Sequence, residues 1–374
     1  MISTDKNIFN EHSEVRQRVV EYGGLVEELH IIIFTGHKYQ ITSTKSQTNY
    51  KLQITNNIFT YPTNSRNKLF YIFDAIKIGK KILDSSGQWL VTSQDPFETG
   101  LAGWLIARKA KTPLQIQIHT DFLSPYFVQH SMLNRLRVWI AKFLIKRADC
   151  IRVVSTRIEN SIYRIMNHEL RIINLPIFVD AEKIQQSPVN VDLHKKYPQF
   201  DFIILMASRF TKEKNILMAI NAMSEVVKQY PKMGLVIVGD GPEERNLKSK
   251  ISNLSADRQD LKVNENVKIE NWTDDLTSCY KTADLFLLTS DYEGYGRTLI
   301  EAASAGCNII SSNVGIANEV LEKENIFEPG NREQLKEKIV NAVKGDIKPP
   351  KAPPKQTKEQ YLLEYKKTWE TCGY

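Results

Sequence analysis

The sequence predicts an α/β protein made of two doubly wound domains, and three observations support this prediction. The chain has 374 residues, which is more than one ordinary hydrophobic core organises. Short apolar runs alternate with helical patterns almost throughout, as in βαβ units around a parallel sheet. A polar span with two prolines, residues 180–199, separates two such series and is the predicted linker.

The first half contains apolar runs that predict strands, with helical patterns between them. The predicted strands are residues 29–34, 89–93, 114–119 and 151–155, and the predicted helices lie near residues 73–83, 100–109 and 132–147. Polar residues follow Met1-Ile2-Ser3 directly, which predicts a very short first strand and an incomplete amino end. Residues 37–62 are polar, Thr-rich and strand-like, which predicts an extra hairpin.

The second half repeats this alternation. The predicted strands are residues 202–207, 235–238, 267–271, 285–289 and 308–311, and the predicted helices are residues 215–229, 243–253, 298–304 and 332–343. Residues 348–354 (KPPKAPP) cannot be helical, because proline removes backbone donors, and a last helix is predicted at residues 357–371. Open α/β sheets bind ligands beyond the carboxyl ends of their strands, so functional residues are expected in the loops after strands.

Composition excludes some classes of protein. With 42% hydrophobic and 25% charged residues the chain is not generally disordered. The four cysteines are far apart without a CxxC pair, so we expect no disulfide framework, no zinc site and a reducing cytoplasm. No apolar run approaches the ~20 residues of a spanning helix, and no signal peptide is recognisable. The net charge of +7 suits a membrane surface, a phosphate-bearing ligand or nucleic acid without selecting one.

The most informative loop follows the predicted strand 285–289 and contains two glycines. Gly294 and Gly296 allow close backbone approach to a ligand, and the first turn of the next helix has unpaired N–H groups, a combination that suits a diphosphate. Glu293 in the loop and Glu301 in the helix can each accept hydrogen bonds from sugar hydroxyls. A glycine turn with two solvated glutamates is an equally good interpretation of this motif alone.

Two further loops lie at strand ends. Arg209 and Lys214 flank the start of a helix, and their charges suit a pyrophosphate whose charge grows as its bond breaks. A basic helix start on the surface is the alternative. Gly239 belongs to a Gly-Asp-Gly-Pro turn that lacks the third glycine of a dinucleotide motif. Neither a P-loop nor a DxD triplet, the pattern of metal-held donor diphosphates, occurs in the chain, so Lys and Arg would supply the countercharge.

Together these residues resemble a GT-B glycosyltransferase of family four. The resemblance rests on Arg209 with Lys214, GDGP at 239–242, ADLFLLTS at 283–290, EGYG-x4-E, and AGCNIISSNVG at 305–315, in an order and spacing that match the family over about 150 residues. It implies two facing Rossmann-like domains, residues 1–180 and 181–355. The last helix, within residues 356–374, would cross back to complete the first domain.

The resemblance also implies an activity: a retaining, metal-independent transfer of a hexosyl group from a UDP- or GDP-linked sugar to an acceptor hydroxyl. No cofactor is implied beyond the nucleotide sugar, and no protein nucleophile is assigned. The product would belong to a surface polysaccharide or glycolipid. A nucleotide-sugar epimerase on the same scaffold and a basic nucleic-acid-binding protein are the alternatives, although aromatic residues are not interleaved with Lys and Arg as nucleic-acid binding would require.

Site roles carry over by position. Arg209 and Lys214 would stabilise the leaving diphosphate, and Glu293 would hold the sugar hydroxyls. Glu301 would bind the ribose. The remaining positions would offer backbone or side-chain contacts to the diphosphate, sugar or base: Gly294, Tyr295, Gly296, Arg297, Thr298, Gly239 and Trp272. His119, at a strand end of the first domain, would bind a hydroxyl of the donor sugar or the acceptor, with a structural histidine as the alternative.

The predicted helix 132–147 has two interpretations. Its stripe of Met132, Leu133, Leu136, Trp139, Ile140, Phe143 and Leu144 is flanked by Arg135, Lys142 and Lys146. A basic flank beside such a stripe can dock on anionic lipid, which would place a cytoplasmic protein on the inner face of the cell membrane. A core helix with a solvated basic flank is the alternative.

Overall fold

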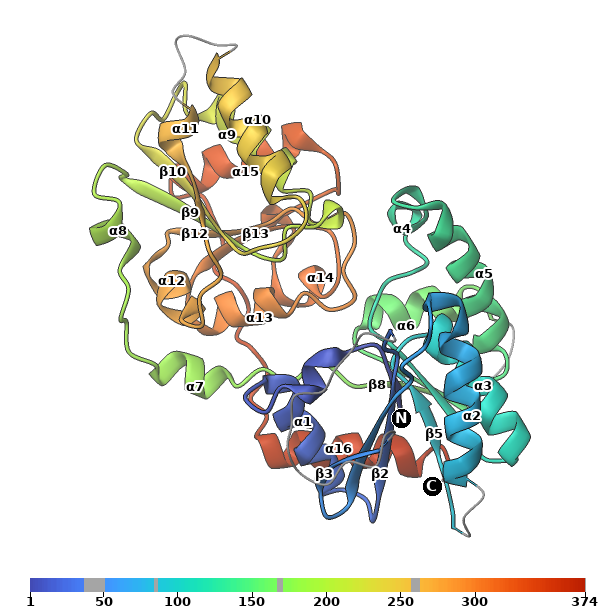
Figure 1. The fold of residues 1–374 in the computed structure, drawn as a ribbon. Coiled ribbons are helices and arrows are strands. Elements are labelled where there is room, and N and C mark those ends of the chain that lie inside the picture. Colours follow the sequence, from blue (N-terminus) through green and yellow to red (C-terminus); the bar gives the residue numbers. More distant parts are fainter. Residues whose placement is uncertain (37–50, 84–86, 167–170, 257–262, 374) are drawn as a thin grey trace. The chain divides into compact units, whose positions relative to one another are not determined.

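Figure 1 shows the computed structural model, which describes residues 1–36, 51–83, 87–166, 171–256 and 263–373. The chain forms two compact units. Unit 1 comprises Met1–Leu123, Ser131–Pro176 and Thr357–Tyr374, and unit 2 comprises Ser124–His130 and Ile177–Gln356. The sequence predicts domain boundaries at residues 180 and 355. The two units of the structure divide after residues 176 and 356. The inclusion of residues 124–130 in unit 2 has no counterpart in the sequence prediction.

Unit 1 is built, in its described residues, around an eight-stranded sheet with the order β3-β4-β2-β1-β5-β6-β7-β8. Among the strands that the structure describes in this unit, β3 and β4 alone pair antiparallel. They form the predicted hairpin, although residues 37–50 of that prediction lie outside the described residues. The strands are β1 (Ile2–Ser3), β2 (Leu29–Ile33), β3 (Leu52–Thr55), β4 (Ile58–Pro62), β5 (Val91–Ser93), β6 (Leu114–Ile118), β7 (Cys150–Val153) and β8 (Ile172–Asn174).

Several helices of unit 1 begin at polar caps that the sequence supplies. Ser13, Ser131 and Ser155 each accept a backbone N–H of the following turn, which satisfies donors that lack a partner inside the helix. The helices are η1 (Lys6–Phe9), α1 (Glu14–Gly23), η2 (Lys68–Phe70), α2 (Tyr71–Leu83), α3 (Glu98–Ala110), α5 (Met132–Ile145), α6 (Thr156–Tyr163) and α16 (Lys358–Glu370). Among the described helices, none is long and apolar enough to cross a membrane.

The last helix, α16, belongs to unit 1, as the family resemblance implies. A capping box of Thr357 and Gln360 starts it. Its aromatic side chains are buried against the unit, and Tyr365 stacks on Tyr22 of α1 with ring centroids 4.2 Å apart. The crossover helix therefore covers a face of the first sheet.

A disulfide also joins the end of α16 to the sheet. Cys150 of β7 and Cys372 are paired although they lie 222 residues apart. The sequence predicts no disulfide framework and does not reveal this one pair, because folding brings together residues whose separation in sequence hides the contact. Cys279 and Cys307 are free and buried.

Unit 2 contains a six-stranded parallel sheet in its described residues, with the order β11-β10-β9-β12-β13-β14. The strands are β9 (Phe202–Ala207), β10 (Met233–Val238), β11 (Val267–Glu270), β12 (Leu285–Leu288), β13 (Asn308–Ser312) and β14 (Ile326–Phe327). β10 is buried along its whole length. Parallel strands covered by helices on both faces are near-continuous apolar runs, which is why the sequence prediction found them.

The helices of unit 2 include several short ones that periodicity does not reveal. They are α4 (Pro125–Gln129), α7 (Ala181–Gln186), α8 (Leu193–Lys196), η3 (Lys212–Lys214), α9 (Ile216–Val226), α10 (Glu244–Ala256), α11 (Val263–Asn266), α12 (Leu276–Thr282), α13 (Arg297–Ser304), α14 (Ala317–Val320), η4 (Lys323–Asn325) and α15 (Arg332–Val343). The predicted helices 215–229, 243–253, 298–304 and 332–343 correspond to α9, α10, α13 and α15.

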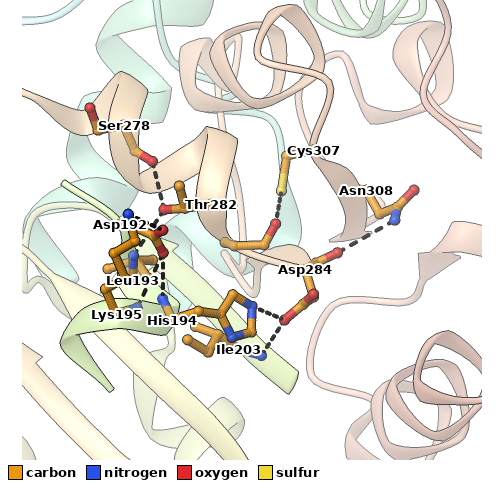
Figure 2. A network of polar contacts seen from close by, with 11 residues as sticks. Asp192, Leu193, His194, Lys195, Ile203, Ser278, Thr282, Asp284, Cys307 and Asn308 are labelled. Atoms are coloured by element: carbon orange, nitrogen blue, oxygen red, sulfur yellow. Dashed lines mark hydrogen bonds and ion pairs between the residues drawn. The ribbon is translucent and has the colours of Figure 1, made fainter. Parts of the chain in front are cut away.

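The predicted linker 180–199 is wrong in part, since it holds α7 and α8. Figure 2 shows why α8 is fixed to unit 2. The carboxylate of Asp284, just before β12, accepts hydrogen bonds from the His194 ring nitrogen at 3.0 Å and from the backbone N–H of Ile203 at 2.7 Å. The Leu193 N–H donates to Thr282 at 3.2 Å. Because polar contacts hold α8 in place, the helix has no periodic apolar face from which the sequence could have predicted it.

Candidate functional site

The strand order of unit 2 reverses between β9 and β12. The chain adds β10 and β11 on one side of β9, and then β12, β13 and β14 on the other. The loops that follow two such neighbouring strands diverge and leave space for a ligand at the carboxyl edge. These are the two loops with the predicted site residues, residues 208–215 and 289–296.

Hydrogen bonds hold the two loops together. The backbone N–H of Asp291 donates to the Glu213 carbonyl at 2.8 Å. The Thr289 hydroxyl donates to the Lys214 carbonyl at 2.8 Å, and the Asn215 amide donates to the Asp291 carboxylate at 2.8 Å. Asn215 adopts a left-handed conformation with φ of 46°. Residues 75 to 78 positions apart in the chain are thereby kept in contact.

The structure brings Lys214 and Glu293 into one ion pair. Lys214 Nζ donates to Glu293 Oε1, and the Ser290 hydroxyl donates to the same oxygen at 2.8 Å. Both charged side chains are mostly buried, with 16% and 15% of their surface exposed. Glu293 Oε2 has no hydrogen-bond partner among the described residues, so it can accept from a hydroxyl of a ligand. The pair presents a cation and an acceptor oxygen at one point.

Helix α13 begins beside this pair. Gly296 precedes the helix with φ of 87°, which an L side chain rarely adopts, and Tyr295 is buried. Gly315 packs against this turn so closely that a Cβ would lie 2.2 Å from the Tyr295 carbonyl oxygen. The N–H groups of a helix's first turn lack intrahelical partners and carry partial positive charge. The tip therefore suits an anion.

Glu301 is held from two sides. Arg297 Nε lies 2.6 Å from Glu301 Oε1, and the hydroxyl of Tyr280 donates to Oε2 at 3.2 Å. Tyr280, on α12, is almost fully buried, and this burial raises its pKa well above the usual value, so the hydroxyl keeps its proton. Arg297 thus pairs with the second glutamate, an arrangement that the sequence analysis did not foresee.

The remaining predicted residues of unit 2 are spread along the same edge. Arg209 is exposed, and its side chain makes no hydrogen bond or ion pair within the described part of the chain, although its backbone carbonyl accepts the Thr211 N–H at 3.0 Å. Gly239 is a necessary glycine, because a Cβ there would lie 2.0 Å from the Ser208 carbonyl oxygen. Trp272 follows the edge strand β11 and is 49% exposed. The structure does not bring Trp272 into contact with Lys214 or Glu293.

Two residues of the site were missed by the sequence analysis. His130 Nε2 lies 3.0 Å from Asp291 Oδ2, and the His130 ring contacts Tyr292 with centroids 5.5 Å apart. Burial raises the pKa of Asp291, which its hydrogen bonds partly offset. Asp291 lies in the predicted loop and could have been found there. His130 is 161 residues away and has no local signal.

His119 lies in unit 1, where it follows β6. Its Nε2 lies 3.1 Å from the Gln117 side-chain oxygen. Burial, together with the positive charges of Arg152 and Arg18, lowers the pKa of His119 to about 3. The ring is therefore neutral at physiological pH.

Among the described residues of the chain, no three His, Cys, Asp or Glu side chains are grouped as metal ligands.

Comparisons with known proteins relate this chain to glycosyltransferases. The family model for glycosyl transferases group 1 matches residues 193–360, which span most of unit 2. The chain is 30% identical over 153 residues to the poly(glycerol-phosphate) alpha-glucosyltransferase of Bacillus subtilis, covering 40% of this chain and 22% of that protein. It is 26% identical over 245 residues to the alpha-monoglucosyldiacylglycerol synthase of Streptococcus pneumoniae, covering 62% and 53%. The chain thus spans less than two thirds of either relative.

The fold is also found among solved structures. The Anabaena protein HepE, in a crystal structure with UDP, superposes with a TM-score of 0.66. The match covers 100% of this chain and 94% of that chain at 15% identity. An identity this low shows a shared fold, and the shared fold is that of two Rossmann-like domains.

Proposed function

We propose that the chain transfers a sugar from a nucleotide diphosphate sugar to an acceptor hydroxyl, since residues 193–360 match the family model for glycosyl transferases group 1 and the chain has the GT-B fold. The observation that carries the proposal is the switch point of unit 2, where the Lys214–Glu293 pair lies beside the first turn of α13. A cation, an acceptor carboxylate and a helix tip together suit a sugar diphosphate.

In this proposal different residues bind different parts of the nucleotide-sugar donor. Lys214 and the exposed Arg209 neutralise the leaving diphosphate, with the backbone of residues 294–298 at the same group. Glu293, through its unpaired oxygen, binds sugar hydroxyls. Glu301 binds the ribose after Arg297 turns from it toward the diphosphate. Gly239 and Trp272 lie near the base, and His119 binds a sugar or acceptor hydroxyl.

We further propose that the transfer is retaining and needs no metal ion. No protein nucleophile is assigned, because the acceptor attacks the face that the leaving diphosphate vacates and passes its proton to that phosphate. Lys214, Arg209 and the α13 amides supply the countercharge that a metal would otherwise provide. The donor nucleotide is uridine or guanosine, and the acceptor is a growing polysaccharide or a lipid-linked sugar.

The acceptor side of the proposal includes an anionic membrane surface. Four apolar residues of α5 are strongly exposed, namely Met132, Leu133, Leu136 and Trp139. Three more are exposed in η2 and the first turn of α2, namely Leu69, Phe70 and Phe73. Both helices start at the carboxyl edge of the unit 1 sheet, with α3 packed between them. Arg135, Lys142 and Lys146 flank the α5 residues, and a basic rim around exposed apolar side chains suits anionic lipid.

An anionic lipid surface also gives the protein a place in the cell. The cytoplasmic leaflet carries a negative surface potential. We therefore propose a cytoplasmic protein that docks peripherally on the inner face of the cell membrane.

A panel of nucleotide sugars tests the proposed function. UDP- and GDP-linked hexoses would be added to the purified protein, with the melting temperature and the release of nucleotide diphosphate as readouts. One nucleotide series is expected to raise the melting temperature, because a ligand that binds only the folded state stabilises it. The absence of any shift with all nucleotide diphosphates and sugars would contradict the proposal. Isomerised sugar without transfer would favour an epimerase.

A further inference from the structure

Buried polar side chains cross the first sheet beneath α16. They are Thr92 of β5, Gln115 and Gln117 of β6 and Arg152 of β7, all at most 4% exposed. Buried polar groups are costly unless they are hydrogen-bonded, so each member of such a row requires a partner of the right kind. Arg152 packs over the Tyr365 ring of α16 at 4.4 Å. The row ends at His119, beyond β6.

One end of the row is oriented by a backbone carbonyl. The Gln115 amide nitrogen lies 2.9 Å from the Thr368 carbonyl oxygen, which can only accept a hydrogen bond. The Gln115 oxygen is therefore the acceptor for the Thr92 hydroxyl at 3.1 Å. Because the Thr92 hydroxyl donates its proton to Gln115, the Thr92 oxygen accepts a hydrogen bond from the Gln117 amide nitrogen at 3.0 Å.

The other end is oriented by a guanidinium group. Arg152 Nη1 lies 3.0 Å from the Gln117 oxygen, and arginine can only donate. Both ends therefore impose the same orientation on Gln117, with its oxygen toward Arg152 and toward His119. The nitrogen of Gln117 also lies 3.3 Å from the Tyr365 hydroxyl.

His119 meets this oriented oxygen. Its Nε2 lies 3.1 Å from the Gln117 oxygen, which only accepts, so Nε2 must carry the ring proton. A second proton on the ring is opposed by the charges that face it, Arg152 from β7 and Arg18 from α1, in addition to burial. Nδ1 is then an unprotonated acceptor. It has no hydrogen-bond partner among the residues that the structure describes.

We propose that Gln117, oriented by Arg152, is a positioning residue that holds His119 in the Nε2–H form and so makes its Nδ1 an acceptor for a hydroxyl of the sugar substrate. The identification of the ligand as a sugar rests on the proposed function, whereas the protonation form of the His119 ring does not. Hydroxyl groups can donate to a bare imidazole nitrogen, and a doubly protonated ring would offer them no acceptor.

The first test observes the ring directly. Protein labelled with ¹⁵N-histidine would be examined by two-bond proton–nitrogen NMR between pH 5 and 8, with His119→Gln used to identify the His119 signals. We expect the Nε2–H form throughout, without titration in this range. A dominant Nδ1–H form, or a His119 titration between pH 5.5 and 7.5, would overturn the proposal. This readout needs no substrate, so its failure is distinct from a failure of the proposed function.

The second test changes Gln117. Gln117→Leu removes the acceptor, so the His119 ring should populate both neutral forms and kcat/KM for the sugar donor should fall about 10-fold. Gln117→Glu retains an acceptor oxygen but adds negative charge, which raises the pKa of His119. This variant should keep the Nε2–H form and activity at pH 8.5, and lose activity as the pH falls toward 6.

Gln115→Leu is the matched control. Gln115 lies on the same strand and face, is equally buried and contacts α16, but it does not touch His119. Its replacement should weaken the docking of α16 and leave the His119 ring in the Nε2–H form. Equal changes in the His119 signals for Gln115→Leu and Gln117→Leu would show a general loss of packing and would overturn the proposal.

Discussion

At the scale of single residues, the site depends on charged groups that are paired with one another. Lys214 is bound to Glu293, and Arg297 is bound to Glu301. Each glutamate has a further donor, Ser290 for the first and a buried tyrosine for the second. Such pairing keeps half-buried charges from standing alone, which would be costly. Binding of a diphosphate would then exchange a carboxylate partner for a phosphate partner.

We predict that Lys214→Ala lowers kcat for sugar transfer by roughly 100- to 1000-fold, the usual effect of removing one group that stabilises developing negative charge. Steady-state release of nucleotide diphosphate measures it. Lys212→Ala is the control, because Lys212 lies in the same short helix and is exposed. Similar activity of both variants would argue against a role of Lys214 at the diphosphate.

At the scale of elements, close approach of backbone segments decides where the helix tip of α13 lies. Gly315, in the loop after β13, has φ of 51° and lies against the turn that precedes α13. The backbone N–H of Ile316 donates to the Tyr295 carbonyl at 2.9 Å. The loop after one strand thus supports the loop after its neighbour, and the position of the amides depends on both.

We predict that Gly315→Ala both destabilises the protein and weakens donor binding. The left-handed conformation alone costs a side chain about 1 to 2 kcal/mol, and the new Cβ would also displace the Tyr295 carbonyl. Gly345→Ala is the control, because Gly345 has φ of 81° and nothing within 4 Å of an added Cβ. Urea unfolding and donor titration measure the two effects. Donor binding that is unchanged in Gly315→Ala would contradict the supporting role.

We also predict that the exposed face of α5 binds anionic vesicles. The protein should sediment with phosphatidylglycerol vesicles and not with phosphatidylcholine vesicles, and Leu136→Gln with Trp139→Gln should reduce the bound fraction. Leu363→Gln is the control, because Leu363 of α16 is 60% exposed and apolar, similar to Trp139 at 66%. Equal binding to both lipids, or equal loss in the control, would rule out this surface.

At the scale of the whole molecule, the neutral histidine links stability to pH. His119 has a pKa near 6.5 in the unfolded chain and about 3 in the folded protein. Between these values the unfolded chain binds a proton that the folded protein does not bind. The free energy of unfolding therefore falls as the pH is lowered through this window.

We predict that urea midpoints decrease from pH 6.5 to pH 4.5, and that His119→Gln reduces this decrease. The variant lacks the imidazole that takes up a proton on unfolding, so its stability should depend less on pH. Identical pH dependence in both proteins would mean that the folded protein protonates His119 as readily as the unfolded chain does.

Much of the fold was predictable from local patterns. The parallel strands β9 and β12 are continuous apolar runs because helices cover both faces, and α15 has a clear helical period and a capping asparagine. The glycine loop with Glu293, and Arg209 with Lys214, follow strand ends, where α/β sheets bind ligands. The short helices α7 and α8 were missed, because a few turns held by polar contacts leave no periodic apolar face.

The sequence by itself determined the two sheets, their helices and the loops in which charged residues and glycines gather, because strands, helices and strand-end loops are encoded within a few residues. Only the tertiary structure decided the partners that are distant in sequence: Lys214 with Glu293, His130 with Asp291 and Cys150 with Cys372. These contacts join segments far apart in the chain. Their geometry depends on strand order and loop packing, which no short stretch of sequence encodes.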